Sequence, residues 1–151
     1  MIEVAYIGRN SPGKGVELIF ESLALVYRND MRVHFFTDYL DNNLCESLDV
    51  QVTQHGWISP EEVWLVNFDF VLIPMVAPET FSFILHESVK NNKGIIVNGC
   101  NESLTSQIID GGILFSSATS LSQILNNLSK NDSSVAKGRL YNKKTLWERL
   151  N

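Results

Sequence analysis

Cysteine is scarce in this sequence, and a long apolar run is absent. The 151 residues include two cysteines, Cys45 and Cys100, whose separation matches neither a metal-binding nor a redox motif. We therefore expect both to be reduced, packed thiols in a cytoplasmic protein. Because no apolar run approaches the ~18 residues that a membrane-spanning helix requires, we also expect no transmembrane segment.

Positive charge is also in short supply. Lysine and arginine number 12 against 17 aspartates and glutamates, which gives a formal net charge of −5. This balance argues against a surface for nucleic acid or for anionic membranes, although it allows a local basic pocket. The sequence offers no nucleophile–histidine–acid set and no cluster of metal ligands, so it indicates neither covalent catalysis nor a metal centre.

What the chain does contain is a regular alternation of strand and helix patterns. Its length suits one domain, residues 1–151, without an internal repeat or linker. Strands are expected at residues 2–7, 32–37, 50–54, 69–73, 94–97 and 113–115. Helices are expected at residues 16–26, 60–67, 81–91, 102–109, 121–128 and 135–150, with one short helix within 38–47 and a break at 131–134. This alternation predicts an α/β fold, with a parallel sheet of about six strands covered by helices on both faces.

Three loops of unusual composition follow the first, third and fourth of these strands. They span residues 8–15, 55–59 and 74–82. In parallel sheets, ligands bind at the carboxyl ends of the strands, near the point where the strand order reverses. We therefore expect the three loops to meet at one edge of the sheet and to form a binding site there.

The first loop has the composition of a phosphate-binding turn. It combines three glycines, which let the backbone approach a ligand, with Arg9 and Lys14, and the N-terminus of a helix follows it. It is not a P-loop, because Gly15 follows Lys14 where a magnesium-binding serine or threonine would stand. The alternative is a flexible strand-to-helix turn that carries two solvated cations.

Two carboxylates, Glu79 and Glu87, lie eight positions apart at the end of the third loop and in the helix after it. On a helix, eight positions correspond to about 12 Å along the axis. That distance suits the two ends of one extended ligand and is too long for the two groups to share a proton. The N–H groups of residues 81–83 are expected to face an anion. The alternative is that two acids occur on an exposed helix by chance.

Three other polar residues have simpler expectations. His34 lies in a strand pattern and is expected to be a packed or edge residue, whereas His55, at a strand end, either lines the pocket or is structural. Asp69 opens a buried strand and is expected to make a structural hydrogen bond.

Taken in order, these residues resemble the group 1 glycosyltransferases, which are retaining enzymes of the GT-B fold. Gly8-Arg9 followed by Lys14-Gly15 looks like the Gly-Arg…Lys-Gly signature of that family. His55-Gly56 is similar to its third-strand loop, Asp69 with Pro74 resembles its Asp…Pro-Ser strand, and Glu79 through Glu87 looks like its E-x7-E motif. The chain therefore resembles the C-terminal half of a GT-B fold, a Rossmann-like three-layer domain that binds the nucleotide-sugar donor.

The resemblance implies a role for each matching position. Arg9 and Lys14 would bind the donor diphosphate and stabilise the charge on the leaving group. Glu79 would hold hydroxyls of the transferred sugar, and Glu87 would hold the ribose hydroxyls. The base loop, the glycine turn and the segment after Glu79 would supply the other donor contacts, from Trp57, Ile58, Gly8, Gly15, Thr80, Phe81, Ser82 and Phe83. The family generally needs no metal for this chemistry, so the resemblance implies no cofactor beyond the donor.

The sequence departs from the family pattern in several places. Ser82 stands where the family usually has glycine, so it would either crowd the phosphate or add a hydroxyl contact. Met75 replaces the usual serine, and residues 92–94 lack the proline commonly found before the fifth strand. Residues 146–149 are similar to the family's tail, which crosses back to the other domain.

The leading hypothesis is the donor-binding half of a hexosyltransferase of polysaccharide biosynthesis, with an NDP-sugar donor and a glycan or lipid-linked acceptor. The N-terminal acceptor domain is expected to be absent from this chain, which would then be a fragment, a truncated gene product or half of a split enzyme with little activity alone. A cytoplasmic location, at the inner face of the membrane through the other domain or the acceptor, and a homodimer are consistent with this hypothesis. The alternatives are a non-catalytic α/β module that binds a partner protein or a small phosphorylated ligand, and a phosphate-binding domain of flavodoxin type.

Overall fold

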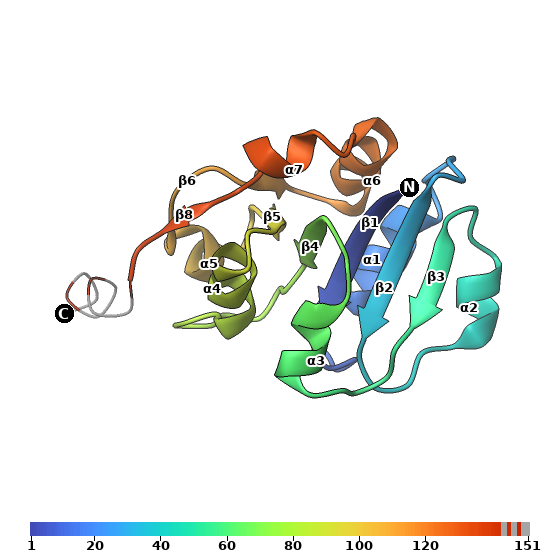
Figure 1. Cartoon of the computed structure of the whole chain (residues 1–151), viewed down its shortest axis with the longest axis horizontal. Helices are drawn as coiled ribbons and strands as arrows, with labels where there is room; N and C mark the ends of the chain where they lie inside the picture. Colours follow the sequence, from blue (N-terminus) through green and yellow to red (C-terminus); the bar gives the residue numbers. More distant parts are fainter. Residues whose placement is uncertain (143–144, 146–147, 149–151) are drawn as a thin grey trace.

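A six-stranded parallel sheet forms the centre of the protein (Figure 1), in a computed structural model that describes residues 1–142, 145 and 148. The strand order is β3-β2-β1-β4-β5-β7, so the order reverses between β1 and β4. The six strands are β1 Ile2–Ile7, β2 Met31–Phe36, β3 Gln51–Gln54, β4 Phe70–Ile73, β5 Gly94–Asn98 and β7 Ile113–Phe115. The α/β fold and the six expected strands are confirmed, each within two residues of its expected bounds.

Helices cover both faces of this sheet, as the sequence predicts. They are α1 Val16–Leu23, α2 Asn42–Glu46, α3 Pro60–Leu65, α4 Phe83–Lys90, α5 Glu102–Thr105, α6 Ala118–Asn127 and α7 Asp132–Val135. Alternate residues of β4 divide the core, because Phe70 and Leu72 pack with α1 and α6, whereas Val71 and Ile73 pack with α3, α4 and α5. The fold therefore has three layers.

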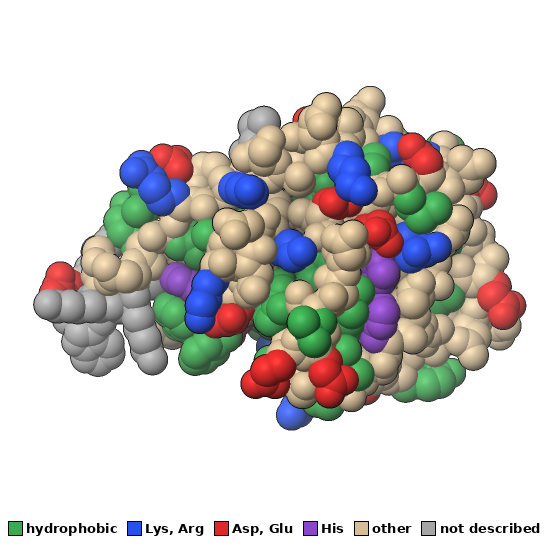
Figure 2. Space-filling view, in the orientation of Figure 1, with side chains coloured by type: hydrophobic (Ala, Val, Ile, Leu, Met, Phe, Trp, Pro, Cys, Tyr) green, Lys and Arg blue, Asp and Glu red, His purple; other side chains and the backbone are tan. Residues whose placement is uncertain are grey.

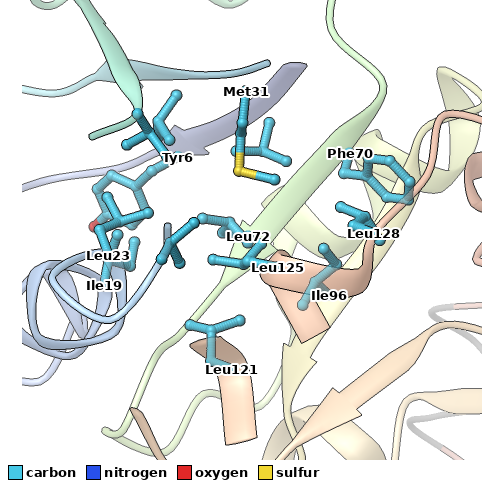
Figure 3. Packing of buried hydrophobic residues seen from close by; sticks show 14 of the residues in the cluster. Tyr6, Ile19, Leu23, Met31, Phe70, Leu72, Ile96, Leu121, Leu125 and Leu128 are labelled. Carbon is cyan, nitrogen blue, oxygen red and sulfur yellow. The ribbon is translucent and has the colours of Figure 1, made fainter. Parts of the chain in front are cut away.

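The larger of the two cores lies between the sheet and the pair α1 and α6 (Figure 3). Ile19 and Leu23 of α1 and Leu121 and Leu125 of α6 are fully buried. These positions recur at the three- and four-residue spacing that predicts the two helices. The apolar periodicity of the sequence therefore indicates the packed faces correctly.

The last third of the chain differs from the expectation. The helix expected at 102–109 ends at Thr105, and β6 Ile108–Asp110 follows and pairs antiparallel with β8 Arg139–Leu140. The helix expected at 135–150 is therefore wrong at β8. Its residues 143–144, 146–147 and 149–150 lie outside the described residues. Positions 146, 147 and 149 of the segment that resembles the family's tail are among them. The break expected at 131–134 contains α7.

Long-range packing explains these differences. Ile108 pairs with Leu140, and both pack against the core beneath α4. Two glycines at positive φ, Gly111 at 78° and Gly112 at 79°, turn the chain from β6 into β7. No local periodicity indicates a pairing across about thirty residues, so the helical pattern is overridden there.

Two simpler expectations have mixed outcomes. Cys45 is buried, but Cys100 is exposed, so the expectation that both thiols are packed is wrong for Cys100. Within the described part of the chain, no helix is long and apolar enough to cross a membrane.

Arg28 joins the segment after α1 to the carboxyl end of α6. Its Nη1 donates to the carbonyl oxygens of Leu125 and Leu128, both at 2.8 Å. Its Nε and Nη2 pair with Asp30 at 2.6 and 2.9 Å. The last carbonyls of a helix lack intrahelical partners and carry the negative end of its dipole, so a guanidinium there stabilises the helix end.

We predict that Arg28→Met lowers the free energy of unfolding by about 1–3 kcal/mol, because hydrogen bonds from a charged donor are lost. Arg139→Met is the matched control. Arg139 also pairs with an aspartate at 2.6 Å, but its side chain is 68% exposed, and exposed pairs contribute only ~0–1 kcal/mol. Urea denaturation measures both variants, and equal losses would contradict the role given to Arg28.

Candidate donor-binding site

The largest concavity of the site lies at the carboxyl edge of the sheet, between α3 and α4, where Figure 2 shows the molecule hollowed with hydrophobic side chains beside the hollow. Its volume is about 720 Å³. Its walls come from two loops, two helices and the ends of two strands, and they include Gly8, Arg9, Lys14, Phe36, Trp57, Ile58, Val63, Trp64, Phe83, Ile84 and Glu87. Seven of the twelve residues that the sequence predicts for the site therefore lie around one cavity.

A second, smaller cavity of about 100 Å³ adjoins the first. Both cavities share Ile7, Gly8, Lys14, Phe83 and Ile84, so Lys14 borders both of them. Glu79 and Ser82 line only the small cavity, and Glu87 lines only the large one. The two carboxylates thus belong to different parts of one composite site, and Lys14 borders both parts.

Glu79 has an unusual side-chain environment. Its Oε2 atom is buried and has no hydrogen-bond partner among the described residues. A buried carboxylate oxygen is costly unless a donor approaches it. Oε2 is therefore suited to accept a hydrogen bond from a ligand hydroxyl that enters the small cavity.

The glycine-rich loop is held by its neighbours. Gly8 N donates to Phe36 O at 3.1 Å, and the Tyr6 hydroxyl donates to Arg9 O at 2.7 Å. Burial, with a smaller contribution from the charge of Asp38, raises the pKa of Tyr6, so this hydroxyl stays protonated and keeps donating. The loop that carries Arg9 is therefore a defined turn, which counts against the alternative of a flexible one.

The same loop is joined to the loop after β4. Gly13 O accepts hydrogen bonds from Val76 N at 2.9 Å and from Ala77 N at 3.0 Å. Gly15 has φ 89°, and a Cβ atom there would collide with the carbonyl of Pro74. Only glycine fits this contact, and Gly15 contributes through the contact and not by lining either of the two cavities.

Residues that follow β5 form hydrogen bonds with the loop that carries Glu79. We did not predict these residues from the sequence. Asn101 Nδ2 donates to Met75 O at 2.9 Å and to Ala77 O at 3.1 Å. Glu79 N donates to Ser103 Oγ at 2.9 Å. The one available signal was Asn101 as a capping residue before α5, which the structure confirms because its side chain accepts from Ser103 N.

Ser82 corrects one expectation. Its N–H donates to Gln107 Oε1 at 3.0 Å, and its Oγ accepts from Leu85 N at 3.1 Å as the N-cap of α4. Only 2% of the residue is exposed. The prediction that its N–H faces an anion is therefore wrong, and its Oγ is engaged as a helix cap.

Two other predicted contacts lie outside the lining of both cavities. The Phe81 ring stacks on His86 at 4.2 Å between centroids and meets the Phe83 ring edge-on at 5.0 Å. Thr80 is exposed in the turn before it. The structure therefore brings together Arg9, Lys14, Trp57, Ile58, Phe83, Glu79 and Glu87, but not Thr80 or Phe81.

His34 and His55 make structural contacts. His34 Nδ1 lies 2.8 Å from His55 Nε2, and His34 Nε2 lies 3.0 Å from Glu3 Oε1. His55 stacks on Phe36 at 4.2 Å and lies behind the pocket wall, outside its lining. Asp69 Oδ2 accepts from Glu3 N at 3.0 Å, which confirms the structural hydrogen bond expected there. Among the described residues, no group of His, Cys, Asp or Glu is arranged to hold a metal ion.

Comparison with known proteins shows likeness in structure only. No protein-family model and no curated protein matches the sequence. The structure of HepE from Anabaena in complex with UDP and glucose matches 99% of this chain and 47% of its own, with a TM-score of 0.71 and 17% identity. This chain therefore spans about half the length of that protein.

Two solved domains match over most of both chains. One is the catalytic domain of cholesterol-alpha-glucosyltransferase from Helicobacter pylori, at TM-score 0.63 and 18% identity, over 83% of this chain and 84% of that one. The other is the C-terminal domain of the group 1 glycosyl transferase LpcC from Francisella tularensis, at TM-score 0.68 and 16% identity, over 90% and 81%. The expected Rossmann-like fold of a GT-B half is thereby confirmed.

Burial lowers the pKa of His86 and of His55, with the charge of His34 adding to the effect at His55 and a hydrogen bond that His86 donates to Gln107 opposing it at His86. In the unfolded chain both histidines take up protons near pH 6.5. Below that pH, and down to the lower folded-state pKa, the unfolded chain binds more protons than the folded protein. The stability that these two histidines contribute is therefore present at pH 7 and is lost as the pH falls.

We predict that the free energy of unfolding decreases between pH 7 and pH 5.5, and that His86→Gln reduces this decrease. Urea denaturation at several pH values measures the slope. Lys90→Gln, at the exposed end of the same helix, should leave the slope unchanged. The same slope for His86→Gln and the wild type would contradict this assignment.

Proposed function

We propose that this chain is the nucleotide-sugar-binding domain of a retaining glycosyltransferase that transfers a hexosyl group from an NDP-sugar to a glycan or lipid-linked acceptor. The observation that carries the proposal is the composite site, in which Glu79 lines the small cavity, Glu87 lines the large one and Lys14 borders both. A nucleotide sugar has the same order of groups, with hydroxyls at the sugar, charge at the diphosphate and hydroxyls at the ribose.

The diphosphate would bind between the glycine-rich loop and the start of α4. Arg9 and Lys14 supply the positive charge, and the backbone at Gly8 allows close approach. During transfer, negative charge builds on the departing diphosphate, and fixed cations stabilise it without a metal. We therefore expect a chelator to leave donor binding unchanged.

The sugar and the ribose would bind to the two carboxylates. Oε2 of Glu79 is buried and lacks a partner among the described residues, so a sugar hydroxyl that reaches it satisfies it. Glu87 faces the large cavity from α4, two turns further on. An ionised carboxylate only accepts hydrogen bonds, which suits hydroxyl groups at both ends of the donor.

The base would bind in the apolar end of the large cavity. Trp57 and Ile58 lie on the loop after β3, opposite Phe83. Trp57 is 64% exposed, so its ring face is available for stacking. Three matching HepE structures hold UDP and glucose, UDP-glucose, and UDP, which supports uridine nucleotides as the first ligands to test.

We predict that the wild-type chain binds UDP, GDP or one of their sugars in a calorimetric titration, and that Lys14→Ala or Arg9→Ala weakens this binding about 10- to 100-fold. Loss of a charge-assisted hydrogen bond to phosphate has this magnitude. Lys90→Ala makes the same change of charge at an exposed position of α4 and should bind normally. Well-folded wild-type protein that binds none of these ligands would count against the proposal.

The isolated chain should transfer little or no sugar even when it binds the donor. Transfer requires an acceptor that is held in line with the sugar and a site that is closed to water. A radiolabelled donor offered with candidate acceptors measures this, and rapid turnover by the isolated chain would contradict it.

One observation favours a second candidate function. Trp57 and Phe83, which line the large cavity, are 64% and 65% exposed, and Val76, in the loop after β4, is 60% exposed. Such a rim suits a covering partner, either the second domain of an enzyme or a separate protein bound by a non-catalytic module. Partner binding that survives Arg9→Ala and Lys14→Ala, without any nucleotide binding, would favour the non-catalytic module.

A further inference from the structure

Gln107 occupies a central position behind the Glu79 turn. It lies between α5 and β6, is 1% exposed, and has every hydrogen-bonding position of its amide in use. Its Nε2 donates to Ser103 O at 2.7 Å and to Glu79 O at 3.3 Å. Its Oε1 accepts from Ser82 N at 3.0 Å and lies 3.2 Å from His86 Nε2.

The surrounding groups fix the orientation of this amide. Ser82 N can only donate, so the atom that faces it must be the oxygen, and the carbonyls of Glu79 and Ser103 can only accept, so the NH2 group faces them. The proton of His86 must then be on Nε2. A reversed amide would place like groups against one another at Ser82 N, Glu79 O and Ser103 O, so the amide has one stable orientation.

This amide joins the two ends of the turn that carries Glu79. One side holds the carbonyl of Glu79, and the other holds the N–H of Ser82, where α4 begins. The N–H of Glu79 is held by Ser103 Oγ, from the same segment as Gln107. Both backbone polar groups of Glu79 are therefore fixed by residues 103–107.

The position of Gln107 is itself tied to the C-terminal part of the chain. Its carbonyl accepts from Tyr141 N at 3.0 Å, directly after β8. The pairing of β6 with β8 thus connects the last described segment to the turn at Glu79. Side chains that are held in this way cost little to order when a ligand binds.

We propose that Gln107 is a positioning residue that acts through Glu79 and makes the site prefer a nucleoside diphosphate sugar to the bare nucleoside diphosphate. This rests on the proposed function. Gln107 lies outside the lining of both cavities, whereas Glu79 faces the small cavity at the sugar end. Arg9, Lys14 and Trp57 come from the loops after β1 and β3, so release of the Glu79 turn is expected to weaken sugar binding more than diphosphate binding.

The test compares two affinities in one protein. Calorimetry measures binding of UDP-glucose, UDP-N-acetylglucosamine and GDP-mannose, each against its own nucleoside diphosphate, for the full chain and its variants. Gln107→Glu keeps the size of the side chain and can still accept from Ser82 N, but it can no longer donate to the carbonyls of Glu79 and Ser103. We expect the sugar-bearing ligand to lose about tenfold in affinity while the diphosphate changes less than about threefold.

Two further variants separate positioning from general damage to the fold. Ser103→Ala removes the acceptor of Glu79 N without changing Gln107, and we expect the same selective loss. Glu79→Ala gives the loss expected when the sugar contact itself is removed, and the double variant Glu79→Ala, Gln107→Glu should lose no more than Glu79→Ala alone.

The outcomes distinguish the inference from the function on which it rests. Wild-type protein that binds none of the ligands overturns the proposed function, and the role of Gln107 with it. Wild-type protein that prefers the sugar nucleotide, with a preference unchanged in both Gln107→Glu and Ser103→Ala, overturns the inference alone. Equal losses for both ligands in both variants also overturn it, because they indicate a structural role.

Discussion

The contact between the loop after β1 and the loop after β4 is the constraint on which the site depends. Gly13 O accepts two N–H groups from the second loop, and Gly15 brings its backbone against Pro74 at a φ that only glycine adopts readily. The two loops come from strands that neighbour each other where the order of the sheet reverses. Because the loops are joined, Lys14 and Glu79 border the same cavity. Without this contact, the cation and the carboxylate would occupy independent turns.

Spacing decides whether two carboxylates help or hinder an anionic ligand. The repulsion between a carboxylate and a diphosphate increases as the distance between them decreases. It is offset when cations lie closer to the diphosphate than either carboxylate does. Lys14 borders both cavities, whereas each carboxylate lines only one. In the proposed function, this arrangement would let Glu79 and Glu87 bind hydroxyls while Lys14 offsets their repulsion of the phosphates.

Local signals in the sequence predict the sheet and the cations, but not the support behind the turn at Glu79. The runs at β1 and β4 and the glycine turn carry their own patterns, and these patterns locate Arg9 and Lys14 at the carboxyl edge. Ser82 also carries a local signal, as an N-cap. We expected its backbone N–H to face an anion, whereas in the structure this N–H donates to Gln107. Gln107 itself has no local pattern, because its partners in the Glu79 turn and in α4 lie 21 to 28 positions away. Pairings of this kind, like β6 with β8, depend on tertiary packing and become visible only in the fold.

The fold separates what must be stable from what must remain open. The core between the sheet and α1 and α6 is built of buried apolar side chains, and it borders the site at Tyr6 and Leu72, which line the small cavity. At that edge, Trp57 and Phe83 remain largely exposed beside a cavity of about 720 Å³. In the proposed function, such a site would hold a donor without excluding water, and transfer to an acceptor instead of to water depends on that exclusion. A second protein surface that covers this edge would exclude water. Because the Glu79 turn is already fixed by residues 103–107, it would not have to rearrange when that surface binds.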